Sequence, residues 1–432
     1  MAMRITFLNS LYPPHGAAGA ENTLRLLAGA FAAHGNTCSV ITLTPNSEPE
    51  IGEIDGVAVH YIPLANVYWP HGGRRPATLR PLFQAIEAYN PVMQARVASV
   101  LRSLRPDVLN CHNLQGFSAA AWLAAARLDI PVVQTLHDYY TACARSSMWL
   151  PARGNCALPC TECRVVATPR RALSRIPAAV TCVSHRLFDR LTAAGAFPRA
   201  REGTQPVRII RGNNAASASF SEMPRRDGLT LGFMGRIEVS KGLDTLIAAI
   251  ENLAPGLLTL RIAGNTDNAY ARSLMTATAG RADVQFVGYA RPADFFPSID
   301  CLVIPSSWED PFPRVFHEAL AFGTPSLVTP LGGLPEAIRP GQTGFIARGS
   351  DADALRGAVS ALLSPGWDRD AVRAACFAEA ENYAPDRIFA QYESVLRAAA
   401  TRGTVPEDAG EVWHLRNVSP KLCNLEEARH GA

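Results

Sequence analysis

Short apolar runs alternate with helical segments along almost the whole chain, and no other feature of the sequence limits the possible fold as strongly. The first half contains six such β-rich runs, and after Pro206 the pattern starts again with seven more. Apolar runs separated by helices indicate parallel sheets in doubly wound α/β domains. The runs are MRITFLN, TCSVITLT, VAVHYIP, DVLNCHN, PVVQTLHD and AAVTCVS, followed by VRIIRG, LTLGFMG, LTLRIAG, VQFVGY, CLVIPS, PSLVTP and TGFIAR.

A chain of 432 residues is too long for one ordinary core and suits two domains of similar size. We expect Rossmann-like domains over residues 1–205 and 206–382, and a separate helix over 383–400. The charged tail 401–432 lacks clear periodicity and is a candidate for disorder. Ligands of open α/β sheets bind beyond the carboxyl ends of the strands, so functional residues are expected there, in a cleft between the domains.

Composition and charge argue against several other classes of protein. The chain is 48% hydrophobic and 18% charged, which is typical of a well-packed enzyme, and its net charge of +3 gives no general case for a nucleic-acid partner. No run reaches the roughly 18 apolar residues of a membrane span. The apolar run at the N-terminus is too short for a secretory signal. We therefore expect a cytoplasmic protein with mostly reduced cysteines.

Glycines and cations follow two of the predicted strands. The turn YPPHGAAGAEN places Gly16 and Gly19 before a helix whose free N–H groups could face an anion, although a plain strand-to-helix turn explains the same pattern. The segment GRIEVSKGLDTLI places Arg236 and Lys241 at a helix entry, where a cationic pair favours a diphosphate. Solvated surface cations are the alternative there, but the position directly after a strand favours phosphate.

Three carboxylates and a histidine follow other predicted strands. Glu309 and Asp310 lie in a Pro-rich loop after CLVIPS, and Glu318 lies on the helix that follows. Acids on such a connection cap the helix, hold a cation or receive the hydroxyl groups of a ligand. His137 follows PVVQTL, where it could contact a substrate or move a proton, with a structural hydrogen bond as the alternative.

Four segments together resemble glycosyltransferase family 4, the retaining nucleotide-sugar enzymes of the GT-B fold. They are GRIEVSKG, VGY, PSSWEDPFPRVFHEALAFGTP and GGLPEAIRPGQTGFIA, and the order of elements is similar to that of the family over about residues 3–400. The family carries two acids with seven residues between them, a spacing that selects Asp310 and Glu318. Asp310 departs from the pattern, because the family usually has Glu at that position.

The resemblance implies roles for these residues. Glu318 would accept hydrogen bonds from the ribose hydroxyls of a nucleotide, Asp310 would face the donor sugar, and Glu309 would be a solvated neighbour or a stand-in for Asp310. The implied catalytic residues are His137, Asp310, Arg236 and Lys241. The implied donor site comprises Gly19, Arg236, Lys241, Gly264, Tyr289, Asp310, Phe312, Arg314, Val315 and Glu318, where Phe312, Arg314 and Val315 supply the backbone N–H groups that the neighbouring prolines lack.

The implied activity is transfer of a sugar, with retention, from a nucleoside-diphosphate sugar to an acceptor hydroxyl in polysaccharide, glycolipid or glycoconjugate biosynthesis. The second domain would bind the donor, UDP first and GDP second, and the first would bind a saccharide or lipid-linked acceptor. The helix over 384–400 would cross back to the first domain. No catalytic cofactor is expected, because cations already face the diphosphate. A GT-B-type epimerase or hydrolase, or a non-catalytic sugar-nucleotide binding protein, is the alternative.

Two further features of the first domain bear on partners. Arginines gather in residues 72–80 and 164–176, where they could touch anionic lipids at the inner face of a membrane or a lipid-diphosphate acceptor, with solvated arginines as the alternative. In the second half, Gly212–Asn213–Asn214 stands where the family has an asparagine–glycine turn. The reversed order argues against assigning the family role to either asparagine.

Four cysteines lie within 21 residues of the loop that follows His137, at Cys143, Cys156, Cys160 and Cys163. The last two form a short-range pair of the kind seen in zinc sites. Four thiolates would close a tetrahedral structural site and order a loop with little apolar content. The spacing therefore predicts a structural zinc site, with four unligated thiols as the alternative.

Overall fold

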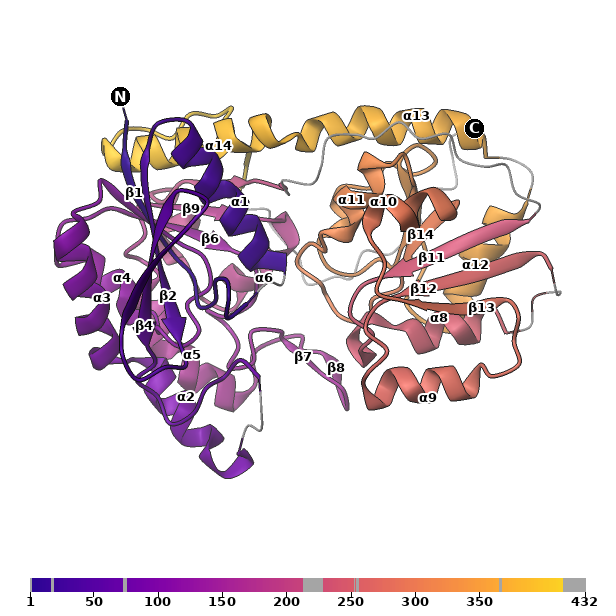
Figure 1. Ribbon diagram of the computed structural model, residues 1–432, viewed down its shortest axis with the longest axis horizontal. Coiled ribbons are helices and arrows are strands. Elements are labelled where there is room, and N and C mark those ends of the chain that lie inside the picture. The colour runs from indigo at the N-terminus through magenta and orange to yellow at the C-terminus, as the bar shows by residue number, and fades with distance from the viewer. Residues whose placement is uncertain are drawn as a thin grey trace.

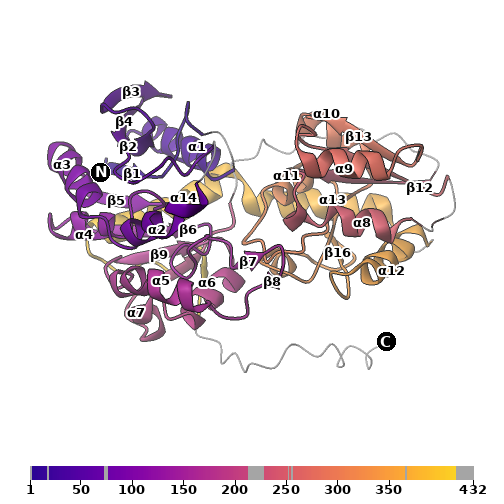
Figure 2. The ribbon, with the colours of Figure 1, turned by 90° about the horizontal axis from the view of Figure 1, so that it is seen from below.

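The computed structural model describes residues 2–414 except 17–18, 73–75, 213–227, 252, 254–255 and 365–366. The described residues form two α/β domains that lie side by side, each around one mainly parallel sheet (Figures 1 and 2). The alternation of strands and helices in the sequence predicted this architecture, and the structure confirms it.

The first domain contains a nine-stranded sheet in the order β17-β10-β9-β6-β5-β1-β2-β4-β3. Its neighbouring strands are parallel except in the two edge pairs, β3 with β4 and β10 with β17. The sheet strands are β1 (Arg4–Leu8), β2 (Thr37–Thr44), β3 (Glu50–Ile54), β4 (Val57–Pro63), β5 (Val108–Cys111), β6 (Val132–Leu136), β9 (Ala179–Cys182), β10 (Val207–Ile209) and β17 (Glu411–Val412), and a separate hairpin joins β7 (Trp149–Leu150) to β8 (Gly154–Asn155).

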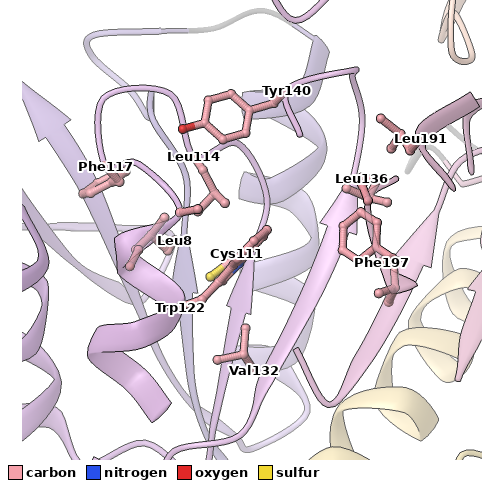
Figure 3. Close-up of a cluster of buried hydrophobic side chains, with 14 of the residues drawn as sticks. Leu8, Cys111, Leu114, Phe117, Trp122, Val132, Leu136, Tyr140, Leu191 and Phe197 are labelled. Atoms are coloured by element: carbon pink, nitrogen blue, oxygen red, sulfur yellow. The ribbon is translucent and has the colours of Figure 1, made fainter. Parts of the chain in front are cut away.

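Helices cover both faces of this sheet. One buried cluster lies on the side of α3, α4 and α6 and includes Trp122 and Leu136 (Figure 3). Trp122 is fully buried and donates its indole N–H to Gln134 at 2.8 Å, which fixes β6 against α4. The helices are α1 (Gly19–Ala33), α2 (Arg80–Ala88), α3 (Pro91–Leu104), α4 (Ala120–Ala126), α5 (Thr161–Leu173), α6 (His185–Ala193) and α7 (Pro198–Arg201).

The second domain contains a six-stranded, fully parallel sheet in the order β13-β12-β11-β14-β15-β16. Because β11 and β14 are neighbours, the loops that follow them meet at the same edge of the sheet. The elements are β11 (Leu229–Met234), α8 (Leu243–Ala249), β12 (Leu258–Ala263), α9 (Ala269–Ala277), β13 (Val284–Gly288), α10 (Pro292–Phe295), β14 (Cys301–Ile304), α11 (Val315–Ala321), β15 (Ser326–Val328), β16 (Gly344–Ile346), α12 (Ala352–Leu363) and α13 (Arg369–Ala380).

Helix α14 (Pro385–Ala400) follows the second domain but packs on the first (Figure 1). Ile388, Tyr392 and Leu396 recur every four residues, so they share one face of the helix, and all three are buried in the core beside β1 and α1. The chain thus passes between the domains once before β11 and again before α14.

One sequence-based assignment in this region is wrong, and a second is wrong for the part of the tail that the structure describes. The run VRIIRG was expected to open the second domain, but its strand β10 pairs in parallel with β9 and belongs to the first sheet. The tail 401–432 was a candidate for disorder, but in its described part, residues 401–414, β17 pairs with β10, and Trp413 packs against Phe188 at 4.7 Å between ring centroids. A two-residue edge strand has no periodicity of its own, so only the pairing partner reveals it.

Candidate functional site

The loop between β14 and α11 carries Asp310, and it meets the loop after β11, which carries Lys241. The Lys241 ammonium lies 2.5 Å from Asp310 Oδ2, and both side chains are largely buried. The Lys241 ammonium also lies 5.4 Å from the centre of the Trp308 ring. Two residues that the sequence separates by about 70 positions are therefore one ion pair at the carboxyl edge of the second sheet.

Two glycines hold the backbone of the Asp310 loop in place. Gly333 donates its N–H to Asp310 O at 3.0 Å. Gly332 has a φ of 71°, and a Cβ added to it would lie 2.1 Å from the same oxygen. Only glycine fits such a close approach with this backbone conformation. The two glycines of the motif GGLPEA are thus explained by packing against the Asp310 loop.

Glu318 on α11 connects to the first domain through an arginine. Arg314 donates to Glu318 Oε1 at 3.4 Å and to Gly19 O, at the start of α1, at 3.1 Å. A side chain at Gly19 would crowd Arg314, because an added Cβ would lie 3.2 Å from Arg314 Cδ. Burial raises the pKa of Glu318, and the Arg314 charge opposes this shift.

Glu309 is not solvated, which corrects the expectation for this residue. Its side chain is buried and forms ion pairs with Arg186 and Arg190 of α6, the latter at 3.0 Å. Its backbone oxygen accepts a hydrogen bond from the Tyr139 hydroxyl at 2.9 Å. Glu309 therefore ties the loop that carries Asp310 to the first domain, and the local sequence does not reveal this because all partners are distant.

The β7–β8 hairpin extends from the first domain to the same loop (Figure 1). The Asn155 side chain donates to Ser307 O at 2.9 Å and accepts from Glu309 N at 2.8 Å. The Trp308 indole donates to Ser147 O at 2.7 Å. Sequence reasoning missed these contacts, since Asn155 lies in a stretch whose only recognised signal was its cysteines.

His137 lies at the end of β6, directly before the segment that contacts Glu309. Its Nε2 is 2.9 Å from Nδ1 of His112, which follows the neighbouring strand β5. A small cavity of about 10 Å³ lies at these strand ends and is lined in part by both histidines, Asp138 and Tyr140. Burial lowers the pKa of His137 to about 4 and that of His112 far below its usual value, so both are neutral near pH 7.

Three other predicted donor-site residues lie just after strands of the second sheet. The Arg236 side chain is 74% exposed and pairs with Glu238 at 3.3 Å. Tyr289 is 90% exposed after β13. Gly264 lies where β12 ends and approaches Gly235 so closely that an added Cβ would lie 2.2 Å from its oxygen.

The remaining two predicted donor residues lie at the start of α11. The Phe312 ring stacks on His317, with 5.0 Å between centroids, and Val315 begins the helix. The two asparagines after Gly212 lie outside the described residues.

The four clustered cysteines do not form a ligand set as they lie in this structure. Cys143 and Cys163 are buried with their sulfur atoms 3.9 Å apart, whereas Cys156 is half-buried and Cys160 is exposed. Within the described part of the chain, no three His, Cys, Asp or Glu side chains are grouped so that they could hold a metal ion. Metal binding would have to draw Cys156 and Cys160 toward the buried pair.

The arginines of residues 164–176 serve partly to hold the fold together. Arg170 is 1% exposed, donates to Tyr140 O at 3.0 Å and lies 4.0 Å from the centre of the Tyr140 ring. Arg171 donates to Ala194 O at 3.0 Å. The other segment, 72–80, lies partly outside the described residues.

Among the described helices, none is long and apolar enough to cross a membrane.

Two doubly wound domains that meet at the loop between β14 and α11 form the GT-B fold of glycosyltransferases. The sequence profile of Glycosyltransferase Family 4 matches residues 17–201, and that of Glycosyl transferases group 1 matches residues 228–365. The chain belongs to glycosyltransferase family 4 and is an enzyme of this class.

Individual relatives agree with this assignment. The chain is 29% identical to the glycogen synthase of Mycobacterium tuberculosis, over 83% of its own length and 85% of that protein. It is also 29% identical to the D-inositol 3-phosphate glycosyltransferase of Stackebrandtia nassauensis, over 78% and 77% of the two chains. A protein of 42.6 kDa in the cps region of Klebsiella pneumoniae is 25% identical, over 78% and 88%.

Solved structures show the same fold at low sequence identity. Sucrose-phosphate synthase from Thermosynechococcus elongatus superimposes with a TM-score of 0.70 at 19% identity, over 92% of this chain and 99% of that one. HepE of Anabaena, in complex with UDP and glucose, superimposes with a TM-score of 0.66 at 17% identity, over 92% and 100%.

Proposed function

We propose that this glycosyltransferase transfers a sugar, with retention of anomeric configuration, from a nucleoside-diphosphate sugar to an acceptor hydroxyl. The observation that carries the proposal is the Lys241–Asp310 ion pair, which lies at the carboxyl edge of the second sheet. The same loop leads to Glu318 and contacts the first domain through Glu309 and Arg314. A cation can bind the diphosphate of a nucleotide-sugar, and carboxylates can accept hydrogen bonds from its hydroxyl groups. Both kinds of group lie here at the junction of the two domains.

The diphosphate binds Lys241 in this proposal. An ammonium group has three donors, and Asp310 uses one of them, so Lys241 can hold a phosphate oxygen while it keeps Asp310 in position. Arg236 is exposed after β11 and can turn toward the same diphosphate. Both cations then stabilise the negative charge that grows on the leaving group, which is electrostatic catalysis.

Glu318 binds the ribose of the donor. Arg314 contacts only Oε1 of this carboxylate, at 3.4 Å, and a carboxylate offers about four acceptor positions. Hydroxyl groups that donate to an ionised carboxylate form stronger hydrogen bonds than those between neutral groups. Arg314 also contacts Gly19, so donor binding at Glu318 is linked to the position of α1.

The preferred nucleotide is UDP, with GDP second. Support comes from the complexes of HepE from Anabaena with UDP and with UDP-glucose, a protein that shares the fold. Retention follows from the family resemblance, in which reaction takes place on the front face of the sugar and the leaving phosphate helps to deprotonate the acceptor. Asp310 then faces the donor sugar, one methylene shorter than the Glu of the family.

The acceptor, a saccharide or a lipid-linked saccharide, binds the first domain. Exposed apolar and basic residues beside the hairpin, including Leu158, Arg164 and Val165, offer a surface for a lipid-linked acceptor or for the membrane face that carries it.

A panel of UDP-, GDP- and ADP-sugars tests the proposal. Thermal shift identifies the donor, because a ligand that binds only the folded state raises the melting temperature. Proton NMR of the product with a panel of saccharide acceptors then gives the anomeric configuration. We expect a UDP-sugar to bind and the product to keep the anomeric configuration of the donor sugar. Release of free sugar without glycoside, or conversion of one UDP-sugar to another, would instead indicate a hydrolase or an epimerase.

A further inference from the structure

A chain of hydrogen bonds leads from the centre of the first sheet to His137. Asn110 lies on β5 and is fully buried, His112 follows the same strand, and His137 follows the neighbouring β6. Asn110 Oδ1 lies 2.9 Å from His112 Nε2, and His112 Nδ1 lies 2.9 Å from His137 Nε2. The two imidazole planes differ by only 18°, so the rings are held nearly parallel.

The direction of this chain follows from Asn110. Its Nδ2 is 3.1 Å from Val133 O and 3.0 Å from Thr135 Oγ1. A backbone carbonyl can only accept, so the amide nitrogen must face β6 and the amide oxygen must face His112. The oxygen also only accepts, and therefore Nε2 of His112 carries the proton.

The remaining protons are then determined. His112 is 4% exposed and neutral, because burial and the neighbouring His137 both lower its pKa. A neutral imidazole has one donor and one acceptor, so Nδ1 of His112 accepts and Nε2 of His137 donates. Other titratable groups nearby are Asp138 and Tyr140 of the cavity, and Glu87 and Arg170, both of which contact Tyr140.

We propose that Asn110 and His112 are positioning residues that hold His137 as its Nε2–H tautomer, so that Nδ1 presents a lone pair to a hydroxyl group of the sugar substrates. The proposal rests on the proposed function for its substrate class, but the tautomer itself does not depend on it. In this state His137 accepts a hydrogen bond and cannot protonate a leaving group. Both histidines line the cavity at the strand ends, but His137 is only half-buried whereas His112 is buried.

An isosteric change should reverse the tautomer. Asn110→Asp places a carboxylate against Nε2 of His112, and an adjacent negative charge favours the protonated imidazole. Doubly protonated His112 donates from both nitrogens, so His137 Nε2 must accept and its proton must move to Nδ1. His137 then presents a donor where the wild type presents an acceptor, although the shape of the site is unchanged.

Two further variants separate this effect from general damage to the core. Thr135→Val removes one partner of Asn110 Nδ2 but leaves the Val133 carbonyl, so the direction of the chain is preserved. His112→Phe keeps a ring in place but removes the acceptor for His137. The first variant is the matched control, and the second serves if Asn110→Asp does not fold.

Long-range proton–nitrogen NMR of the full chain labelled with ¹⁵N-histidine reports the tautomer directly, with His137→Gln used for assignment. We expect a protonated Nε2 and a bare Nδ1 on His137 in wild type and Thr135→Val, the reverse in Asn110→Asp, and a mixture in His112→Phe. A wild-type His137 protonated on Nδ1, or one tautomer shared by all variants, would overturn the proposal. No substrate is needed, so a wrong donor assignment does not affect this result.

Kinetics with the donor found by thermal shift tests the link to the substrate. Asn110→Asp should lower kcat/KM by about 2- to 10-fold, the effect of one neutral hydrogen bond, while Thr135→Val stays near wild type. A reversed tautomer with unchanged kcat/KM would overturn the role of Nδ1 as the acceptor for a substrate hydroxyl.

Discussion

Replacement of Glu318 by Gln tests the donor site most directly, because the amide keeps the shape of the side chain and removes its charge. Loss of one hydrogen bond to a charged group costs about 1.5–3 kcal/mol. Donor affinity should therefore fall roughly 10- to 150-fold. Isothermal titration calorimetry with the nucleotide-sugar found by thermal shift measures this change.

Acidification should lower the donor affinity of the wild type but raise its stability relative to Glu318→Gln. Burial raises the pKa of Glu318 in the folded protein, so the folded state holds its proton more tightly than the unfolded state. The stabilising contribution is complete below the unfolded pKa of about 4.5 and is lost as the pH rises through the folded pKa. Relative to Glu318→Gln, the wild type should therefore gain stability as the solution is acidified from neutral toward this range, and lose donor affinity.

A matched control is Glu393→Gln, which removes a carboxylate paired with an arginine four residues away on α14, outside the proposed site. It should leave donor affinity unchanged. Wild-type affinity in a folded Glu318→Gln protein would refute the ribose assignment, and a stability difference that does not vary with pH would refute the electrostatic reasoning.

Three further outcomes are expected. Arg236→Ala and Lys241→Ala should each cost more activation free energy, measured from kcat, than free energy of unfolding, because the charge they meet develops on the leaving diphosphate. Full rates at saturating donor in both variants would argue against the phosphate assignment. Gly332→Ala should displace the Asp310 loop and cost roughly 1–3 kcal/mol of stability together with activity, whereas Gly341→Ala, with a similar φ but open space around the added Cβ, should leave activity intact; equal effects would contradict the role of close approach. Elemental analysis of protein purified without chelator should find about one equivalent of zinc if the four cysteines bind it, and less than about a tenth of an equivalent with all four thiols free would exclude the site.

The sequence by itself determined the two-domain α/β architecture, because most of the parallel strands are largely buried and so are rich in apolar residues. The alternation with helices indicated parallel sheets in the doubly wound arrangement. The spacing of Asp310 and Glu318 was equally local, since one short loop and one helical turn separate them.

Only the tertiary structure decided which groups meet. Lys241 pairs with Asp310 because β11 and β14 are neighbours in the sheet, an order that no local pattern encodes. Glu309 looked solvated in a Pro-rich loop, yet α6 supplies two arginines that make its burial possible. The direction of the Asn110–His112–His137 chain likewise depends on Val133 O of the adjacent strand. Such contacts form between residues far apart in the chain, so local periodicity and propensity carry no signal for them, and the packing of the two sheets supplies it.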